Sequence, residues 1–447
     1  MPLAGLPIGK RSALLLDKEN MTKYSISPMS SLYELYLRHP RISTDSRRIE
    51  PDSVFFALRG ASFDGNRFAA DALEKGAAYA VVDDPSLPNT RPDKADRLIV
   101  VDDALQTLQT LAREHRRELG LPILAITGSN GKTTTKELVS RVLAEKYEVY
   151  ATRGNLNNHI GVPLTLLAMT RDVEFGIVEM GASACGEIAL LCSIAEPNYG
   201  IVTNIGRAHL EGFGGPEGVR RGKGELYDWL ARTGGGGFVP ANDPVLMSMA
   251  AERETLAAEC YPTTLADGVE HHLEGDYNRF NVAAAVAVGR YFGVDDERIR
   301  YAVGSYRPDN HRSQKIRTGQ NTLILDCYNA NPSSMQASLV NFRQEPLESC
   351  TRKILILGDM LELGDWSDAE HRHIISLAAE IPDARILLVG PHFAKAYRSL
   401  ESRPADTTLY PSQEALAAEL RKHPVSQALI LVKGSHSIGL ERLADLL

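Results

Sequence analysis

The feature that most constrains the fold is a glycine-rich turn, TGSNGKTT at residues 127–134, which joins an apolar run to an amphipathic one. The apolar run, Ile123–Thr127, has the length of a buried strand, and Lys136–Lys146 has helical spacing. A strand, a glycine-rich turn and a helix in this order are the context of a phosphate-binding loop. Such a loop lies at the edge of a parallel sheet flanked by helices, so we expect an α/β domain here.

The individual residues of this turn have the chemistry that phosphate binding needs. Gly128 and Gly131 allow backbone N–H groups to point at phosphate oxygens, and the helix N-terminus adds the positive end of its dipole. Lys132 would neutralise the β- and γ-phosphates, and the Thr133 hydroxyl would ligate Mg²⁺. Ile126 stands where the full motif has its first glycine, so this is a shortened variant. The alternative is an ordinary strand-to-helix turn with a chance Gly-Lys-Thr.

Length and patterning divide the chain into three domains. At roughly 150 residues per domain, a chain of 447 residues has about three. We expect a small α/β domain over 21–103, a central phosphate-loop domain with a parallel sheet over 104–311, and a doubly wound, Rossmann-like domain over 312–447. Residues 1–20 hold one short apolar patch and are expected to be a disordered leader.

Apolar runs and turn residues locate the elements within these blocks. The expected strands are Val54–Leu58, Ala80–Val82 and Leu98–Val101 in the first block, Ile123–Thr127, Phe175–Glu179 and Gly200–Asn204 in the second, and Thr322–Asp326, Ile354–Leu357, Ile386–Val389 and Leu429–Val432 in the third. The expected helices are Phe68–Lys75, a helix that follows the N-cap residue Asp103 and reaches Leu119, Lys136–Lys146 and Asn281–Tyr291.

Composition excludes several classes of protein. The 49 Lys and Arg residues against 57 Asp and Glu residues give a net charge of -8, which argues against a general nucleic-acid binder. No apolar run approaches the roughly 18 residues of a membrane span, so we expect no membrane insertion. The five cysteines are odd in number and lack CxxC spacing, which favours a reducing cytoplasm over a disulfide framework.

Two polar residues follow strands of the expected middle sheet, close to the phosphate loop. Glu179 ends one strand, where a carboxylate can hold Mg²⁺, although helix capping or an ion pair is the alternative. His209, with Glu211 nearby, follows the next strand, although a lone histidine is as often structural. Lys223 lies in a basic segment, and nothing in the bare sequence distinguishes it.

Arg312 and Asp326 lie at the junction of the second and third blocks. From there, either side chain could reach a nucleotide that the middle domain holds. An interdomain salt bridge is the equally good alternative.

Several segments resemble motifs of one enzyme family. TGSNGKTT, EMGAS at 179–183, TNIGRAHLEGFG at 203–214, KGELY at 223–227 and NRFN at 278–281 are similar to motifs of the ATP-dependent Mur ligases, which build the peptide stem of bacterial cell-wall precursors. YNANP at 328–332 resembles the branch that adds D-alanyl-D-alanine to UDP-MurNAc-tripeptide, and TDSR at 44–47 resembles the domain that holds the UDP-sugar both in this branch and in the branch that adds the third amino acid. The C-terminal block lacks the DNPR-like segment of the branch that adds the third amino acid.

The resemblance implies roles for individual residues. ATP would be bound by Gly128, Ser129, Asn130, Gly131, Lys132, Thr133 and Thr134, with Asn281 at the adenine, Arg312 at the phosphates and Asp326 at the ribose. One Mg²⁺ would be held by Thr133 and Glu179, and a second by His209 and Lys223, which with Lys132 complete the catalytic set. The lysine that matches Lys223 is carbamylated in many members. Substrate contacts are expected from Asp45, Ser46, Arg47, Asn155, Asn158, Asn329 and Asn331.

The resemblance also implies a reaction. The tripeptide carboxylate would take the γ-phosphate of ATP to give an acyl phosphate, which the amine of D-alanyl-D-alanine would then attack. We expect the enzyme to be a monomer in the cytoplasm. Two alternatives remain open: another ligase of the superfamily, from the third-residue branch or similar to folylpolyglutamate synthetase, and a phosphate-loop switch that binds ATP without ligating.

Overall fold

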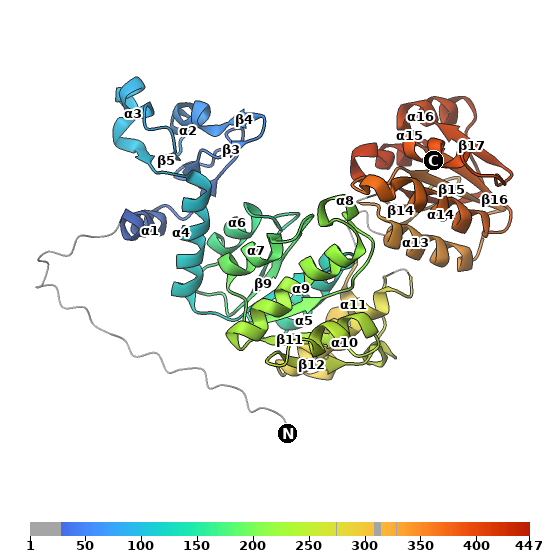
Figure 1. Cartoon of the computed structure of the whole chain (residues 1–447), viewed down its shortest axis with the longest axis horizontal. Helices are drawn as coiled ribbons and strands as arrows, with labels where there is room; N and C mark the ends of the chain where they lie inside the picture. The colour runs from blue at the N-terminus through green and yellow to red at the C-terminus, as the bar shows by residue number, and fades with distance from the viewer. Residues whose placement is uncertain (1–27, 274, 308–313, 328) are drawn as a thin grey trace, which may run out of the picture.

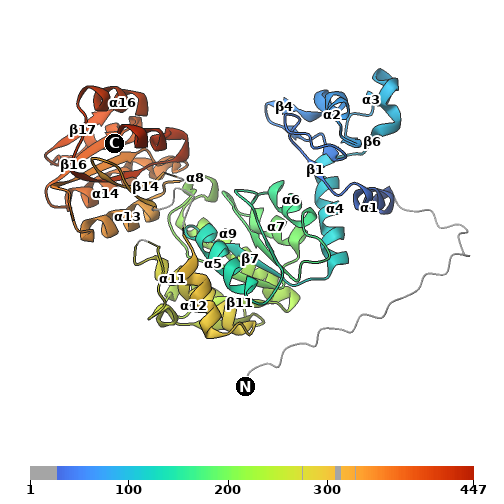
Figure 2. The same cartoon turned by 180° about the vertical axis from the view of Figure 1, so that it is seen from behind.

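A computed structural model describes residues 28–273, 275–307, 314–327 and 329–447 of the chain. These residues form three lobes in chain order (Figure 1). The first lobe carries a four-stranded sheet and a two-stranded hairpin, and the middle and third lobes each carry a six-stranded sheet. Seen from behind in Figure 2, the middle lobe lies between the other two. The expected leader, residues 1–20, and Arg312 lie outside the described residues.

The first lobe is a small α/β unit whose main sheet is parallel throughout, with strand order β1-β2-β5-β6. Its elements are β1 (Ile42–Ser43), β2 (Val54–Phe56), β3 (Arg59–Gly60), β4 (Phe63–Asp64), α2 (Ala69–Glu74), β5 (Tyr79–Val82), α3 (Leu87–Thr90) and β6 (Leu98–Val100). A small core of its own, which includes Phe55, Leu73 and Val82, joins α2 to the sheet. The three strands and the helix expected here are present within two residues of their expected ends.

Helix α4 (Ala104–Leu119) joins the first lobe to the middle lobe. The Asp103 side chain caps it by accepting a hydrogen bond from the Gln106 N–H at 2.8 Å, as its residue type predicts. Helix α1 (Pro28–Arg38) packs against α4, and the Tyr36 hydroxyl donates to the Leu167 carbonyl at 2.5 Å. The first described helix is therefore anchored on the middle lobe.

The middle lobe is doubly wound around a parallel sheet with strand order β12-β11-β10-β7-β9-β8. Its strands are β7 (Ile123–Thr127), β8 (Val149–Ala151), β9 (Phe175–Glu179), β10 (Tyr199–Val202), β11 (Gly236–Pro240) and β12 (Ala257–Tyr261). Its other helices are α5 (Lys132–Ala144), α6 (Gly161–Leu167), α7 (Glu187–Ala195), α8 (Leu210–Phe213), α9 (Pro216–Thr233), α10 (Pro244–Ala251), α11 (Asn278–Tyr291) and α12 (Asp296–Ser305).

Alternate residues of β7 show how both faces of the middle sheet are covered. Leu124 and Ile126 belong to a core that contains residues of α5, α11 and α12. Ile123 and Ala125 belong to a second core, with residues of α4, α6, α7 and α9. Successive strand residues point to opposite faces, so helices lie on both sides of the sheet.

Three expected boundaries in this lobe are wrong by a few residues. Helix α5 begins at Lys132 rather than Lys136, because the positive φ of Gly131, 78°, ends the loop immediately before it. Strand β10 ends at Val202, since Thr203 and Asn204 leave the sheet and bind the phosphate loop. Helix α11 begins three residues before Asn281. The edge strands β8 and β12 were not expected, because neither is a buried apolar run.

The third lobe has the order β13-β14-β18-β15-β16-β17. Its strands are β13 (Gln314–Arg317), β14 (Thr322–Asp326), β15 (Arg352–Gly358), β16 (Ala384–Val389), β17 (Thr407–Tyr410) and β18 (Ala428–Lys433), and its helices are α13 (Pro332–Gln344), α14 (Ser367–Ala379), α15 (Pro391–Arg398) and α16 (Gln413–Lys422). Apolar cores on both faces confirm the expected doubly wound sheet. The antiparallel edge strand β13 was not expected. No helix within the described ranges is long and apolar enough to cross a membrane.

Candidate active site

The phosphate loop is a turn that only glycine can make at two positions. Gly128 has φ 141° and Gly131 has φ 78°, both in the left-handed region that side-chain-bearing residues rarely adopt. A Cβ on Gly128 would lie 2.0 Å from the Thr203 hydroxyl oxygen, and one on Gly131 would lie 2.6 Å from Asn281 Oδ1. Close contact with neighbouring elements therefore adds to the conformational requirement.

The residues after β10 hold this loop in place. The Asn130 N–H donates to Asn204 Oδ1 at 3.1 Å, and the Thr203 hydroxyl donates to the Asn130 carbonyl at 2.6 Å. Ser129 and Gly206 bond reciprocally, since the Gly206 N–H donates to Ser129 Oγ at 2.9 Å and that hydroxyl donates to the Gly206 carbonyl at 3.2 Å. Sequence reasoning did not identify Thr203 or Asn204 as loop supports, although both stand at the start of a segment with family resemblance.

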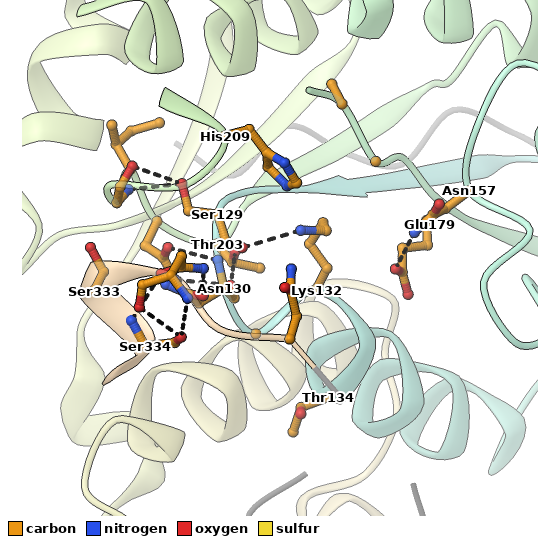
Figure 3. A pocket seen from close by; sticks show the side chains of 18 of the residues that line it. Ser129, Asn130, Lys132, Thr134, Asn157, Glu179, Thr203, His209, Ser333 and Ser334 are labelled. Carbon is orange, nitrogen blue, oxygen red and sulfur yellow. Dashed lines mark hydrogen bonds between the residues drawn. The ribbon is translucent and has the colours of Figure 1, made fainter. Parts of the chain in front are cut away.

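Lys132 lies over the loop that it follows (Figure 3). Its ammonium donates to the Gly128 carbonyl at 2.7 Å and to the Ser129 carbonyl at 3.3 Å. In Figure 3, Lys132 lies between Ser129 and Asn130 on one side and Glu179 on the other. A cation is thus positioned at the N-terminus of α5, where the dipole already favours an anion.

Glu179 is buried at the end of β9, with 2% of its surface exposed. Its carboxylate accepts hydrogen bonds from the Thr133 hydroxyl at 3.0 Å and from the Asn157 amide at 2.9 Å, both of them neutral donors. A carboxylate, a hydroxyl and an amide beside a phosphate loop suit Mg²⁺, which prefers oxygen ligands and takes the rest from phosphates and water. Among the described residues no three His, Cys, Asp or Glu side chains gather in a metal-binding arrangement.

Asn157 was missed as a site residue, and its two neighbours have different environments. Asn158 accepts hydrogen bonds from the Ile160 and Gly161 N–H groups at 3.1 and 2.9 Å, so its side chain shapes the turn before α6. The Asn155 carbonyl accepts from the Asn157 N–H at 2.8 Å. The signal that could have selected Asn157 is its place in a run of asparagines, but only the fold shows which one reaches Glu179.

Lys223 is a buried lysine on α9, 1% exposed. Its ammonium donates to the Ala182 carbonyl at 3.1 Å and lies 5.1 Å from the centre of the Phe213 ring. Burial, followed by the charge of Lys132, holds the pKa of Lys223 well below its ordinary value. A lowered pKa raises the share of the neutral amine, which is the nucleophilic form of a lysine.

His209 lies at the start of α8 and lines the cavity described below. Its Nδ1 is hydrogen-bonded to the Glu362 carboxylate of the third lobe, and this bond lowers the pKa of Glu362. The sequence placed His209 near the phosphate loop, and Figure 3 shows the ring on the same side of the pocket as Ser129. The partner Glu362 was not foreseen, because 153 residues separate the two.

The candidate site residues of the third lobe lie at the carboxyl ends of β14 and β18. Asp326 and Lys433 are register partners in the sheet, and the Lys433 ammonium donates to Asp326 Oδ2 at 2.5 Å. The Ser338 hydroxyl donates to the same oxygen at 2.8 Å. Lys433 also reaches the Asn329 carbonyl at 3.4 Å. Sequence reasoning did not select Lys433 as a site residue.

Asn331 joins the two lobes directly. Its side-chain carbonyl caps α13 by accepting from the Ser334 N–H at 2.9 Å, and Ser334 completes a capping box. Its side-chain amide donates to Asn130 Oδ1 at 2.9 Å. A residue of the third lobe therefore contacts the phosphate loop itself.

A cavity of 930 Å³ lies between the middle and third lobes. The expected site residues that line it are Ser129, Asn130, Gly131, Lys132, Thr134, Asn155, Asn158, Glu179, His209, Asn281, Asp326, Asn329 and Asn331. Gly128, Thr133 and Lys223 lie behind this lining and contact it through hydrogen bonds or packing. Asn281 also accepts from the Thr135 hydroxyl at 3.0 Å, which ties α11 to α5.

The segment Asp45, Ser46 and Arg47 lies in the first lobe and is not part of the cavity lining. The Arg47 guanidinium forms a two-pronged pair with Asp45, with distances of 2.9 and 2.8 Å, and this pair lowers the pKa of Asp45. The Ser46 carbonyl accepts from the Lys75 ammonium at 2.7 Å. The structure therefore does not bring this expected substrate segment together with the nucleotide residues.

Comparison with known proteins decides the family. The sequence matches three profiles: the Mur ligase family catalytic domain over residues 40–116, the Mur ligase middle domain over 126–263 and the Mur ligase glutamate ligase domain over 311–436. It is 34% identical to the UDP-N-acetylmuramoyl-tripeptide–D-alanyl-D-alanine ligase of Bacillus subtilis, over 90% of this chain and 92% of that protein. The chain belongs to the Mur ligase family. The Escherichia coli ligase of the same name is 30% identical, over 90% and 92% of the two chains.

Solved structures agree with this assignment. MurF from Acinetobacter baumannii superposes with a TM-score of 0.81 at 30% identity, covering 91% of this chain and 93% of that one. MurF from Thermotoga maritima, in complex with ADP, gives 0.77 at 25% identity, covering 92% and 97%. Folylpolyglutamate synthase from Mycobacterium tuberculosis shares the fold alone, with a TM-score of 0.59 at 14% identity and coverage of 76% and 94%. The expected family and three-part α/β architecture are confirmed, whereas the boundaries at 104 and 312 stay predictions.

Proposed function

We propose that this chain is an ATP-dependent ligase that joins D-alanyl-D-alanine to UDP-MurNAc-tripeptide and so forms the pentapeptide precursor of peptidoglycan. The observation that carries the proposal is the cavity between the lobes, which has the phosphate loop on one wall and Asp326, Asn329 and Asn331 on the other. Ligases of this name are similar to the chain over about nine-tenths of its length, 90% for the Bacillus subtilis protein.

The wall of the cavity that the middle lobe forms would supply the groups for phosphoryl transfer. The loop N–H groups and Lys132 would receive the phosphates of ATP, and Asn281 the adenine. Thr133 and Glu179 would hold one Mg²⁺, and His209 with Lys223 a second. When bound, the metal screens charge so that the substrate carboxylate can approach the γ-phosphate. Arg312, a proposed phosphate contact, lies outside the described residues.

Lys223 is suited to carbamylation by its burial and lowered pKa. Its neutral amine would attack CO₂ to form an N–C bond, releasing one proton and leaving a carbamate with two oxygen ligands. This change converts a buried cation, which would repel Mg²⁺, into an anionic ligand. Carbamylation therefore completes the second metal site in the proposal.

The wall of the cavity that the third lobe forms would bind the dipeptide and the ribose. Asn329 and Asn331 are the proposed dipeptide contacts, and Asp326 the ribose contact. A free carboxylate is a poor acyl donor because oxide would be its leaving group, and phosphorylation replaces oxide by phosphate. Holding both reactants between two lobes supplies much of the rate effect by proximity. Asp45, Ser46 and Arg47 would hold the UDP end in the first lobe, and Asn155 and Asn158 the tripeptide side.

We also propose that the reaction takes place in the cytoplasm, where ATP and UDP-linked precursors would both be available. The five cysteines are all free in the structure, which supports a reducing compartment. We further propose that the enzyme acts as a monomer, without nucleic acid or membrane insertion. Size-exclusion chromatography with light scattering tests this, and a dimer at assay concentration contradicts it.

Phosphate release with each substrate omitted in turn tests the function. We expect release only when Mg-ATP, UDP-MurNAc-tripeptide and D-alanyl-D-alanine are all present. Release that a single amino acid supports would move the protein to another branch of the family. Release without any acceptor would leave a plain ATPase, the switch-like alternative.

A further inference from the structure

The loop after β10 is attached to two different parts of the molecule. On one side Asn204 and Gly206 hold the phosphate loop through the bonds to Asn130 and Ser129. On the other side, the Arg207 guanidinium pairs with Glu370 at 2.8 Å and the Arg207 N–H donates to Ser333 Oγ at 2.8 Å. The loop therefore lies between the nucleotide site and the third lobe.

His209 and Glu362 form another contact between this loop and the third lobe. Both residues have left-handed backbones, with φ 53° for His209 and φ 61° for Glu362. Residues with a Cβ rarely adopt this conformation, so the surrounding contacts must hold it. The Glu211 N–H supplies one such contact by donating to the Glu362 carbonyl at 3.1 Å. Gly364 is also close, since a Cβ there would lie 3.2 Å from atoms of the Glu211 side chain.

The segment that carries Glu362 is firmly attached within the third lobe. The Met360 N–H donates to Nε2 of the buried His371 at 3.1 Å, and the Leu361 N–H donates to Ser435 Oγ at 3.0 Å. The Asp359 carboxylate in turn accepts from the His392 and Phe393 N–H groups at 2.9 and 2.8 Å. The Glu362 side chain is 60% exposed in a loop, but hydrogen bonds hold the three residues immediately before it.

We propose that Glu362 is a positioning residue that orients His209 from the third lobe. By accepting the Nδ1–H of the ring, Glu362 fixes the ring plane and leaves Nε2 as the nitrogen available to a cation in the cavity. A carboxylate that holds the distal nitrogen of a ligating histidine is a general means of fixing its tautomer and raising its basicity. Since the two residues lie on different lobes, the His209 site is complete only when the third lobe is docked. The inference rests on the proposed role of His209 as a cation ligand.

Cation affinity tests the inference without any need for turnover. Mn²⁺ binding to the full chain in the presence of ADP, followed by electron paramagnetic resonance, is compared for wild type, Glu362→Ala and Glu362→Gln. We expect Glu362→Ala to weaken the histidine-dependent Mn²⁺ site about 10- to 100-fold. Glu362→Gln should recover part of this, because the amide oxygen still accepts from Nδ1–H.

A double-variant cycle separates positioning from simple interface support. In a His209→Ala background, Glu362→Ala should change Mn²⁺ affinity less than about 2-fold, because its target is gone. Glu370→Gln is the matched control, since Glu370 pairs with Arg207 in the same interface without touching His209. It should leave Mn²⁺ affinity near that of wild type.

Three outcomes would overturn the inference: unchanged Mn²⁺ affinity in Glu362→Ala, additive effects of Glu362→Ala and His209→Ala, or an equal loss in Glu370→Gln. Thermal melting of each variant checks that the fold is intact, and Glu362→Gln takes the place of Glu362→Ala if the latter does not fold. Because ADP and Mn²⁺ suffice for the measurement, failure of the ligase function appears separately in the phosphate-release assay.

Discussion

The middle and third lobes are both doubly wound around six-stranded sheets, yet a lysine near the carboxyl ends of their strands does different work in each. Lys132 follows the loop after β7 and donates to two carbonyls of that loop, 2.7 and 3.3 Å away. Lys433 ends β18 and forms an ion pair of 2.5 Å with Asp326 of the adjacent strand. The first cation faces the cavity at a helix N-terminus, and the second is committed to a carboxylate.

The difference shows that the same sheet architecture supports two kinds of polar edge. In the middle lobe, glycines at positive φ let the loop turn sharply into α5, and the Lys132 side chain lines the cavity. In the third lobe, the Lys433–Asp326 ion pair joins the strand ends to each other, so the two charges balance within the edge. We therefore expect substitutions at the strand ends of the middle lobe to lower turnover. Substitutions at the strand ends of the third lobe should lower stability more than turnover.

The largest expected effect is a loss of turnover when Lys132 of the middle lobe is replaced. Lys132→Ala removes the cation that would stabilise charge on the transferring phosphoryl group, so kcat/KM should fall about 10³-fold. The melting temperature should stay close to that of wild type, because the Gly128 and Ser129 carbonyls that the ammonium bonds belong to the loop immediately before it. Coupled ADP release and thermal melting measure the two quantities.

Lys395→Ala is the matched control for this prediction. Lys395 is an exposed lysine of the third lobe that pairs with Asp368 at 2.7 Å and is not part of the cavity lining. Its removal should leave kcat/KM unchanged. A Lys132→Ala enzyme that keeps more than a tenth of wild-type activity would contradict the assignment of Lys132.

The next largest effect is a loss of stability when the ion pair at the strand ends of the third lobe is broken. Lys433→Met leaves the Asp326 carboxylate, whose side chain is 14% exposed, without its cation, so the free energy of unfolding should fall by about 3 kcal/mol. Adding Asp326→Asn removes the unpaired charge and should recover most of that loss. Urea unfolding followed by circular dichroism gives both values. If the double variant is no more stable than Lys433→Met, the ion pair is not what holds these strand ends.

A smaller effect is expected at Asn331, where the two lobes meet. Asn331→Ala loses the cap of α13, which should lower the free energy of unfolding by about 1 kcal/mol. Asn331→Asp keeps an oxygen for the Ser334 N–H but has no amide to donate to Asn130. Urea unfolding should therefore find Asn331→Asp near wild type. Equal losses in both variants would mean that the contact with Asn130, not the cap, is what stabilises.

The smallest expected effect is a dependence of stability on pH, to which one buried histidine on α4 and one in the third lobe contribute. Burial lowers the pKa of His115 on α4 and of His371 on α14. A histidine with a lowered folded-state pKa binds fewer protons than in the unfolded chain, so its contribution to stability is complete above about pH 6.5 and is lost as the pH falls below that value toward the folded pKa. Unfolding free energies measured from pH 7.5 to 5.5 should fall accordingly. A flat profile over this range would show that neither histidine is held neutral.

How much the sequence could predict follows from how local each signal is. The phosphate loop is a contiguous segment, so its residues, the strand before it and the helix after it could all be identified. Glu179 also follows from a strand end. In contrast, the partners of Asp326 and His209 lie 107 and 153 residues away in the chain, and only the strand order and the docking of the lobes bring them together.

Element boundaries were less predictable than the elements themselves. The start of α5 at Lys132 depends on the φ of Gly131, which residue type permits but does not specify. Three of the four residues of the edge strand β13 are polar, and the strand pairs antiparallel with β14, a pairing that hydrophobic pattern alone does not select. Asn157, rather than its neighbours, contacts Glu179 because of the exact turn between β8 and α6.

The central claim is that the cavity between the two lobes activates a carboxylate by phosphorylation before the amine attacks. Turnover with tripeptide whose terminal carboxylate carries ¹⁸O in both positions tests it directly, with mass spectrometry of the released phosphate. The account predicts one ¹⁸O atom in each phosphate, because the carboxylate oxygen leaves with the phosphoryl group. Unlabelled phosphate, released while product forms, would contradict an acyl-phosphate route.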